Sequence, residues 1–208
     1  MKDVLKCVAG AKSPDVVKKV RQRVAEFKLL GRKPSKEIFE EMCFCILTAN
    51  YTAEGGIRIQ KAIGDGFLTL SEKQLAAKLR ALGHRFPNTR AKYIYEARKH
   101  AAVLKKKINS FSDKDARREW LVKNIKGLGY KEASHFLRNV GFDDYAIIDF
   151  HIVDFLERHG VVKRPKTLTP KKYVEIEKAL RKLADACGMT QGELDLYLWY
   201  CETGKILK

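Results

Sequence analysis

The stretch GLGYKEASHFLRNVG, residues 127–141, decides the fold of this chain. Two glycines, Gly127 and Gly129, bracket the apolar residue Leu128, and a second apolar residue, Ile125, precedes them. Apolar residues then recur at the spacing of one helical face: Ala133, Phe136, Leu137 and Val140. We therefore expect one helix to end before Gly127 and a second to begin near Tyr130. Glycine suits both turn positions, because it accepts positive φ and leaves the backbone amides uncovered.

This turn also predicts a binding site for the backbone of a nucleic acid. The amides of Gly127, Gly129 and Tyr130 would point along the axis of the new helix, whose N-terminus carries partial positive charge. Lys126 adds a cation beside them. A helix-hairpin-helix of this kind typically holds DNA through phosphate groups, whatever the base sequence. A glycine-rich turn that only joins two helices has the same local pattern.

The charge of the chain favours the nucleic-acid interpretation. The 208 residues include 42 Lys and Arg against 25 Asp and Glu, which gives a net charge of +17. The excess is uneven, since residues 1–31 carry +5, residues 32–141 carry +12 and residues 142–208 carry no net charge. A polyanion is the natural partner of such a surface, and nucleic acid is the commonest one. The alternative is a lysine-rich, well-solvated protein without such a partner.

The rest of the chain carries helix signals and no strand pattern. An N-cap followed by proline starts a helix at Ser13-Pro14 and again at Thr169-Pro170. Capping boxes start helices at residues 71–74 and 190–193. A long stretch with helical spacing, residues 89–107, follows Asn88. No segment alternates polar and apolar residues over several repeats, so we predict an all-α fold.

We expect two helical lobes, with the hairpin at a DNA-binding cleft between them. The charge changes near Gly141, which precedes the acidic pair Asp143-Asp144. One lobe, a helical barrel, would comprise residues 32–141 and end in the hairpin, about residues 115–141. The second would comprise residues 1–31 together with residues 142–208.

The cellular compartment and the cysteines give further expectations. No run of about 18 apolar residues is present, so no transmembrane helix is expected. The N-terminus carries an acid and lacks a long apolar core, which makes it a poor signal peptide, and we expect an intracellular protein. The five cysteines form no CxxC pair and no metal-ligand spacing, so we expect reduced thiols.

Lys131 has two possible roles, a phosphate contact or a nucleophile. The helix N-terminus, Lys126 and Lys123 all disfavour a protonated amine, and the neutral amine is the form that a nucleophile needs. Asp149 follows in the apolar run AIIDF, where a charge needs a reason. It could cap the helix expected in HIVDFLERHG, or face a cleft and take part in chemistry. The spacing alone leaves both questions open.

A resemblance to a known family favours chemistry. Five stretches carry the resemblance: GLGYKEASHFLRN, the run AIID after it, LTANYTAEGGIRIQKAIGDGF (47–67), LGHRF (82–86) and the stretch from ELDLYLWY to the final TGKILK (193–208). Together they resemble the archaeal-type 8-oxoguanine DNA glycosylase/AP lyases of the helix-hairpin-helix superfamily. The likeness runs from about residue 20 to the last residue. One departure is Phe150, where the family usually has a basic residue.

The resemblance implies a mechanism for the lysine and the aspartate. The damaged nucleotide would be flipped out of the duplex, and Lys131 would attack C1′ of its deoxyribose. Asp149 would stabilise the positive charge that develops on the sugar. A Schiff base on Lys131 and β-elimination on the 3′ side would follow. No cofactor or metal is required, although carbonyls of Lys123, Ile125 and Leu128 could hold a structural cation.

The resemblance also implies a base pocket. Phe86 and Trp199 would sandwich 8-oxoguanine, and the terminal carboxylate of Lys208 would accept hydrogen bonds from the base. Two weaker candidates for the pocket are Asp195, which could simply be solvated, and His135, which could equally be a buried core residue. The gap opposite the flipped base would be filled by His84 and Arg85. The expected partner is double-stranded DNA containing 8-oxoguanine, bound by a monomer.

Two other functions remain open at this point. The chain could be a non-catalytic DNA-binding module that uses the hairpin only to hold phosphates. It could also be a glycosylase/lyase for a different oxidised base.

Overall fold

The computed structural model describes residues 1–208 and confirms the all-α prediction, with no β-strand. The chain divides into two compact units. The first comprises Met1–Lys28 and Gly141–Lys208, and the second comprises Leu29–Val140. The boundaries predicted from the sequence lie after residues 31 and 141, three residues and one residue later than those of the structure. No helix combines the length and the apolar character needed to cross a membrane.

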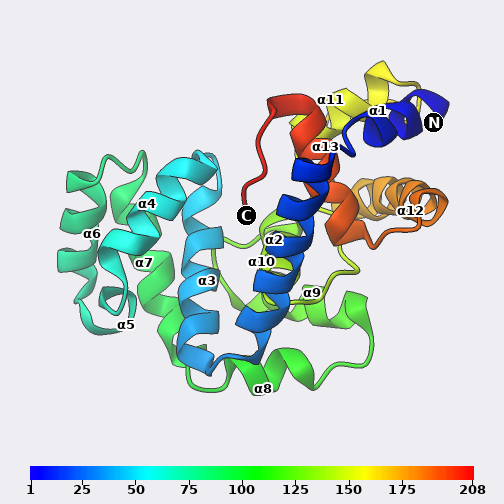
Figure 1. Cartoon of the computed structure of the whole chain (residues 1–208). Coiled ribbons are helices and arrows are strands. Elements are labelled where there is room, and N and C mark those ends of the chain that lie inside the picture. Colours follow the sequence, from blue (N-terminus) through cyan, green and yellow to red (C-terminus); the bar gives the residue numbers. More distant parts are fainter. The chain divides into compact units, whose positions relative to one another are not determined.

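The first unit contains five helices from the two ends of the chain (Figure 1). Helix α13 packs against the helices α1, α11 and α12. The last turn of α2 extends into the second unit. The helices are α1 (Lys2–Gly10), α2 (Pro14–Arg32), α11 (Phe150–Arg158), α12 (Pro170–Cys187) and α13 (Gln191–Thr203).

The second unit is built around α3, which is buried along most of its length and contacts α4, α7, α8 and α10. Figure 1 shows α3 in light blue, followed along the chain by the short helices α4 to α7. The helices of this unit are α3 (Ser35–Thr48), α4 (Ala53–Ile63), α5 (Gly66–Thr69), α6 (Glu72–Ala81), α7 (Pro87–Ala97), the 3₁₀ turn η1 (Arg98–His100), α8 (Leu104–Asn109), α9 (Lys114–Asn124) and α10 (Tyr130–Asn139).

The predicted caps are largely confirmed. Ser71 and Gln74 form both bonds of a capping box at the start of α6. Thr169 accepts a hydrogen bond from the amide of Lys172 at the start of α12. Thr190 does the same for Glu193 at the start of α13. These short-range signals set where the helices of each unit begin.

The expectation of a long helix after Asn88 is wrong. Helix α7 begins one residue earlier, at Pro87, and ends at Ala97; the 3₁₀ turn η1 follows, and α8 begins at Leu104. Arg98 donates to the carbonyl of Phe67 at 2.6 Å, which ties the chain to α5 at the break. The turn allows Leu104 to be fully buried, with α8 packed on α3. Tertiary packing therefore overrides the helical spacing here.

Candidate active site on a helix-hairpin-helix

The predicted hairpin is present. Helix α9 ends at Asn124, and α10 begins at Tyr130. Gly127 has φ of +88°, and a Cβ atom there would lie 2.6 Å from Cδ2 of Tyr93. Glycine is therefore required at this position both by the backbone conformation and by the close approach of a ring.

Gly129 differs from the sequence expectation of two positive φ values. It is the N-cap of α10, with φ of −88° and ψ of −171°, an extended conformation that N-cap residues normally adopt. Its amide donates to Oε2 of Glu132 at 3.2 Å. The amide that was expected to bind phosphate is therefore engaged by a carboxylate of the chain itself.

These two glycines give a matched pair of variants. Gly127→Ala is expected to destabilise the protein by about 2–3 kcal/mol, because it combines positive φ with a clash. Gly129→Ala should cost about 1 kcal/mol or less, since an extended N-cap tolerates alanine. The new Cβ atom would lie 3.2 Å from Oε2 of Glu132, the end of a flexible side chain. Denaturant unfolding of both variants measures the difference, and equal losses would contradict the assignment of Gly127 as the constrained position.

Lys131 lies in the first turn of α10, with 23% of its side chain exposed. Its amine lies 3.9 Å from Oε1 of Glu132. The two lysines that were expected to act on it have acids of their own. Lys126 pairs with Glu96 at 2.9 Å, and Lys123 lies 3.7 Å from Oε2 of Glu119. The positive field expected from these lysines is therefore partly neutralised.

Asp149 is the N-cap of α11 and accepts a hydrogen bond from the amide of Ile152 at 3.0 Å. The capping role expected for it is thus confirmed, and its second carboxylate oxygen is not needed for the cap. Phe150, the departure from the family pattern, is 41% exposed. The guanidinium of Arg164 lies 5.0 Å from the centre of the Phe150 ring. A positive charge is therefore present next to position 150, although residue 150 itself is aromatic and not basic.

His84 is buried and hydrogen-bonded, so it does not suit the filling role that the resemblance implied. Its Nδ1 accepts from the amide of Phe86 at 3.0 Å, and its Nε2 lies 2.9 Å from the carbonyl oxygen of Leu47. The ring also stacks on Tyr51, with centroids 4.4 Å apart. Burial lowers the pKa of His84, which fits a neutral ring with one donor and one acceptor. Its contacts fix the shape of the LGHRF loop.

The neighbours of His84 are accessible. Arg85 is exposed, and Phe86 is 36% exposed at the start of α7. The guanidinium of Arg85 lies 5.0 Å from the centre of the Phe86 ring. His135, by contrast, is buried in the second unit, edge-on to Phe44 with centroids 5.6 Å apart, which favours a packing role.

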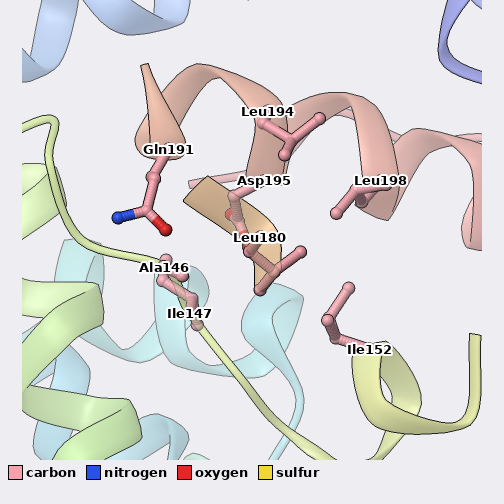
Figure 2. Close-up of a pocket in the computed structure, with 8 residues that line it drawn as sticks. All are labelled: Ala146, Ile147, Ile152, Leu180, Gln191, Leu194, Asp195 and Leu198. Atoms are coloured by element: carbon pink, nitrogen blue, oxygen red, sulfur yellow. The ribbon is translucent and has the colours of Figure 1, made fainter. Parts of the chain in front are cut away.

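The C-terminal candidates belong to the first unit. Trp199 is half-buried on α13, with His151 edge-on at 6.4 Å between centroids. Asp195 lies at a small, mostly apolar pocket (Figure 2). The other lining residues are Ala146, Ile147, Ile152, Leu180, Gln191, Leu194 and Leu198. Lys208 is half-buried at the end of the chain.

The candidate residues are divided between the two units. The second unit holds Lys131, the hairpin and the LGHRF loop, while the first holds Asp149 and the C-terminal candidates. Of the three carbonyls proposed for a cation, that of Ile125 accepts the amide of Leu128 at 3.2 Å within the turn. The cation site stays a prediction.

Comparison with known proteins decides the family. A family described as 8-oxoguanine DNA glycosylase matches residues 20–189. The chain belongs to the 8-oxoguanine DNA glycosylase family. Among its relatives, the 8-oxoguanine DNA glycosylase/AP lyase of Korarchaeum cryptofilum is 51% identical over 207 residues, which cover 99% of this chain and 98% of the relative. That of Methanocaldococcus jannaschii is 52% identical over 206 residues, which cover 99% of each chain.

A solved structure of the Methanocaldococcus jannaschii glycosylase/lyase, in complex with a 15mer DNA containing 8-oxoguanine, has a similar fold. Its TM-score against this chain is 0.95 at 51% identity, covering 98% of this chain and 99% of that one. The similarity extends over nearly the whole chain, so it includes the hairpin and most of the C-terminal segment.

Two charged residues of this glycosylase-family hairpin escaped the sequence analysis. Glu132 holds the Gly129 amide, and the spacing of three residues from the N-cap is a capping-box signal that could have revealed it. Arg118 is buried, donates to Ser134 at 3.3 Å and lies 5.0 Å from the centre of the Tyr130 ring. It therefore links α9 to α10, but in the sequence it looks like one more surface cation.

Proposed function

We propose that this chain excises 8-oxoguanine from duplex DNA and then cleaves the strand 3′ to the resulting abasic site. The observation that carries the proposal is membership of the family over nearly the whole chain, together with a lysine in the first turn after the hairpin. A lysine at this place can supply the amine that both steps require.

Lys131 is the proposed nucleophile. Its neutral amine attacks C1′ of the flipped deoxyribose, the glycosidic bond breaks, and the base leaves with the bonding electrons. The sugar ring opens to a Schiff base on Lys131. Loss of a proton from C2′ then expels the 3′ phosphate by β-elimination. Asp149 stabilises the positive charge on the sugar while the glycosidic bond breaks. Electrostatic stabilisation of this type supplies the largest part of the rate enhancement in many enzymes. No cofactor takes part in these steps.

The hairpin is proposed to hold the DNA backbone through the amides of Gly127 and Tyr130 and through the side chain of Lys126. A phosphate at the Gly129 amide would have to displace the carboxylate of Glu132. The net charge of +17 supports a polyanionic partner. We assign this function to the lobe of residues 32–141, and we propose that the other lobe carries Asp149 and the C-terminal residues of the base pocket. We expect the protein to act as a monomer in the cytoplasm or nucleoid.

The base pocket is proposed to consist of Phe86, Trp199, Asp195 and the terminal carboxylate of Lys208. Stacking of a base on an aromatic ring contributes about 1–3 kcal/mol. The exposure of Phe86 and the half-buried position of Trp199 leave part of each ring accessible. A carboxylate can accept hydrogen bonds from the N1 and N2 hydrogens of guanine.

Borohydride trapping tests this function. The chain is incubated with duplexes that carry 8-oxoguanine, thymine glycol or undamaged guanine in one sequence context. We expect a covalent adduct and strand cleavage with the 8-oxoguanine duplex and neither with undamaged guanine. Binding without any adduct would support a non-catalytic module instead. A stronger reaction with thymine glycol would assign the enzyme to a different oxidised base.

A further inference from the structure

The segment that leads into Asp149 has an unusual way of pairing its backbone. Residues 145–148 form no helix or strand, yet the side chains of Tyr145, Ala146, Ile147 and Ile148 are all buried. Buried amides and carbonyls need hydrogen-bond partners. The fold contains no β-sheet that could supply them.

Two side chains of α12 act as those partners. The hydroxyl of Tyr173 donates to the carbonyl of Ala146 at 2.7 Å and accepts from the amide of Ile148 at 3.2 Å. Oε1 of Glu177 accepts from the amide of Ala146 at 3.2 Å. Both side chains are almost fully buried. All of these residues belong to the first unit, and Figure 2 shows Ala146 and Ile147 near Leu180 of the same helix.

The spacing of the two partners fits the segment. Tyr173 and Glu177 are four residues apart, so they lie on one face of α12, about 6 Å apart along its axis. Ala146 and Ile148 are two residues apart, and an extended chain advances about 6.6 Å over that step. One helical face can therefore pair with alternate residues of the segment, as a neighbouring strand would.

The upstream end of the segment is also held. Gln191, at the start of α13, donates to the carbonyl of Asp144 at 3.1 Å. The amide of Gly192 donates to the carbonyl of Asp143 at 2.8 Å. The segment is therefore fixed from residue 143 to residue 148, and Asp149 is the next residue.

We propose that Tyr173, supported by Glu177, is a positioning residue for Asp149. The hydroxyl of Tyr173 fixes the backbone on both sides of Ile147. It thus sets the position of the Asp149 backbone, from which the carboxylate side chain extends. Asp149 caps α11 with one oxygen only, so the direction of its other oxygen depends on the backbone that Tyr173 holds. This inference rests on the proposed role of Asp149 in base excision.

The test is a double-mutant cycle between Tyr173→Phe and Asp149→Asn, read by single-turnover excision of 8-oxoguanine. We expect Tyr173→Phe alone to slow excision by about 10-fold to 100-fold, with DNA affinity changed by less than about 2-fold, because small misplacements of a catalytic group have effects of this size. In the Asp149→Asn background, Tyr173→Phe should slow excision no further. Equal slowing in both backgrounds, or no slowing in either, would overturn the inference.

The same cycle tests the proposed role of Asp149 separately from the positioning role of Tyr173. If Asp149→Asn alone leaves excision unchanged, the proposed role of Asp149 fails, and the positioning role falls with it. If Asp149→Asn slows excision but the effects of the two variants are additive, only the positioning role fails. Thr169→Ala is the control, since it removes the cap of α12 without touching the bonds to residues 146 and 148. It should leave the excision rate unchanged well below its melting temperature.

A second pair of variants covers the case in which Tyr173→Phe does not fold. Glu177→Gln keeps an oxygen that can accept from the amide of Ala146, whereas Glu177→Leu does not. We expect the excision rate of Glu177→Gln to stay within about 3-fold of the wild-type rate. The excision rate of Glu177→Leu should fall by about 10-fold. Equal rates for the two folded variants would overturn the role of Glu177.

Discussion

Lys131→Gln is expected to abolish the borohydride-trapped adduct and to slow strand cleavage by about 10³-fold or more, the scale seen when an essential nucleophile is removed. The side-chain amide of glutamine cannot form a Schiff base, so neither the borohydride-trapped adduct nor the β-elimination that cleaves the strand can occur through residue 131. Glutamine is one atom shorter than lysine but stays polar and occupies the same place in the first turn of α10. Affinity for 8-oxoguanine duplex should therefore fall only a few-fold, through the loss of one positive charge. Gel analysis of trapped complexes and titration of labelled duplex measure the two effects.

Lys126→Gln is the matched control for that variant. Lys126 belongs to the same hairpin, but it lies before the turn and pairs with Glu96. Its replacement should weaken DNA binding slightly and leave the adduct intact. A normal adduct from Lys131→Gln would show that the amine comes from another residue. Loss of the adduct in both variants would point to failed DNA binding.

Asp149→Asn is expected to slow base excision by about 10²-fold to 10³-fold, comparable to the loss of one group that stabilises charge in a transition state. Asparagine caps a helix about as well as aspartate, so the bond to the amide of Ile152 can persist. Stability and DNA affinity should therefore stay close to wild type. Single-turnover excision, thermal unfolding and duplex titration measure the three quantities.

Asp149→Ala separates the two functions of this carboxylate. It removes both the charge and the cap, so it should add a loss of about 1 kcal/mol in stability to the slow excision. If Asp149→Asn keeps full activity while Asp149→Ala loses stability, the residue is only a helix cap. Collapse of DNA binding in Asp149→Asn would also contradict the catalytic role.

Much of the fold could be predicted from the sequence because its signals are short-range. The bounds of α9 and α10 around the glycine turn follow from the apolar spacing. The caps at Ser71 and Thr169 follow from side chains that bond the amide three residues away. The break after Ala97 was missed, because it depends on the bond from Arg98 to the carbonyl of Phe67, which is distant in the sequence.

The candidate site shows the same division. Lys131 and Asp149 could be named from local context, since one follows the hairpin and the other caps a helix. The burial of His84 could not be foreseen, because it depends on Leu47 and Tyr51 in another part of the chain. Nothing in the local sequence distinguishes Tyr173 from the other aromatic residues of the chain. Its bonds to Ala146 and Ile148 appear only once α12 is folded beside the segment before Asp149.

Mass spectrometry of the trapped complex tests the central claim most directly. The wild-type chain is reduced with borohydride on 8-oxoguanine duplex, digested with nuclease and protease, and the peptides that carry a deoxyribose remnant are sequenced. We expect the remnant to be attached to Nζ of Lys131. A remnant on any other lysine, or on the N-terminal amine of Met1, would contradict it.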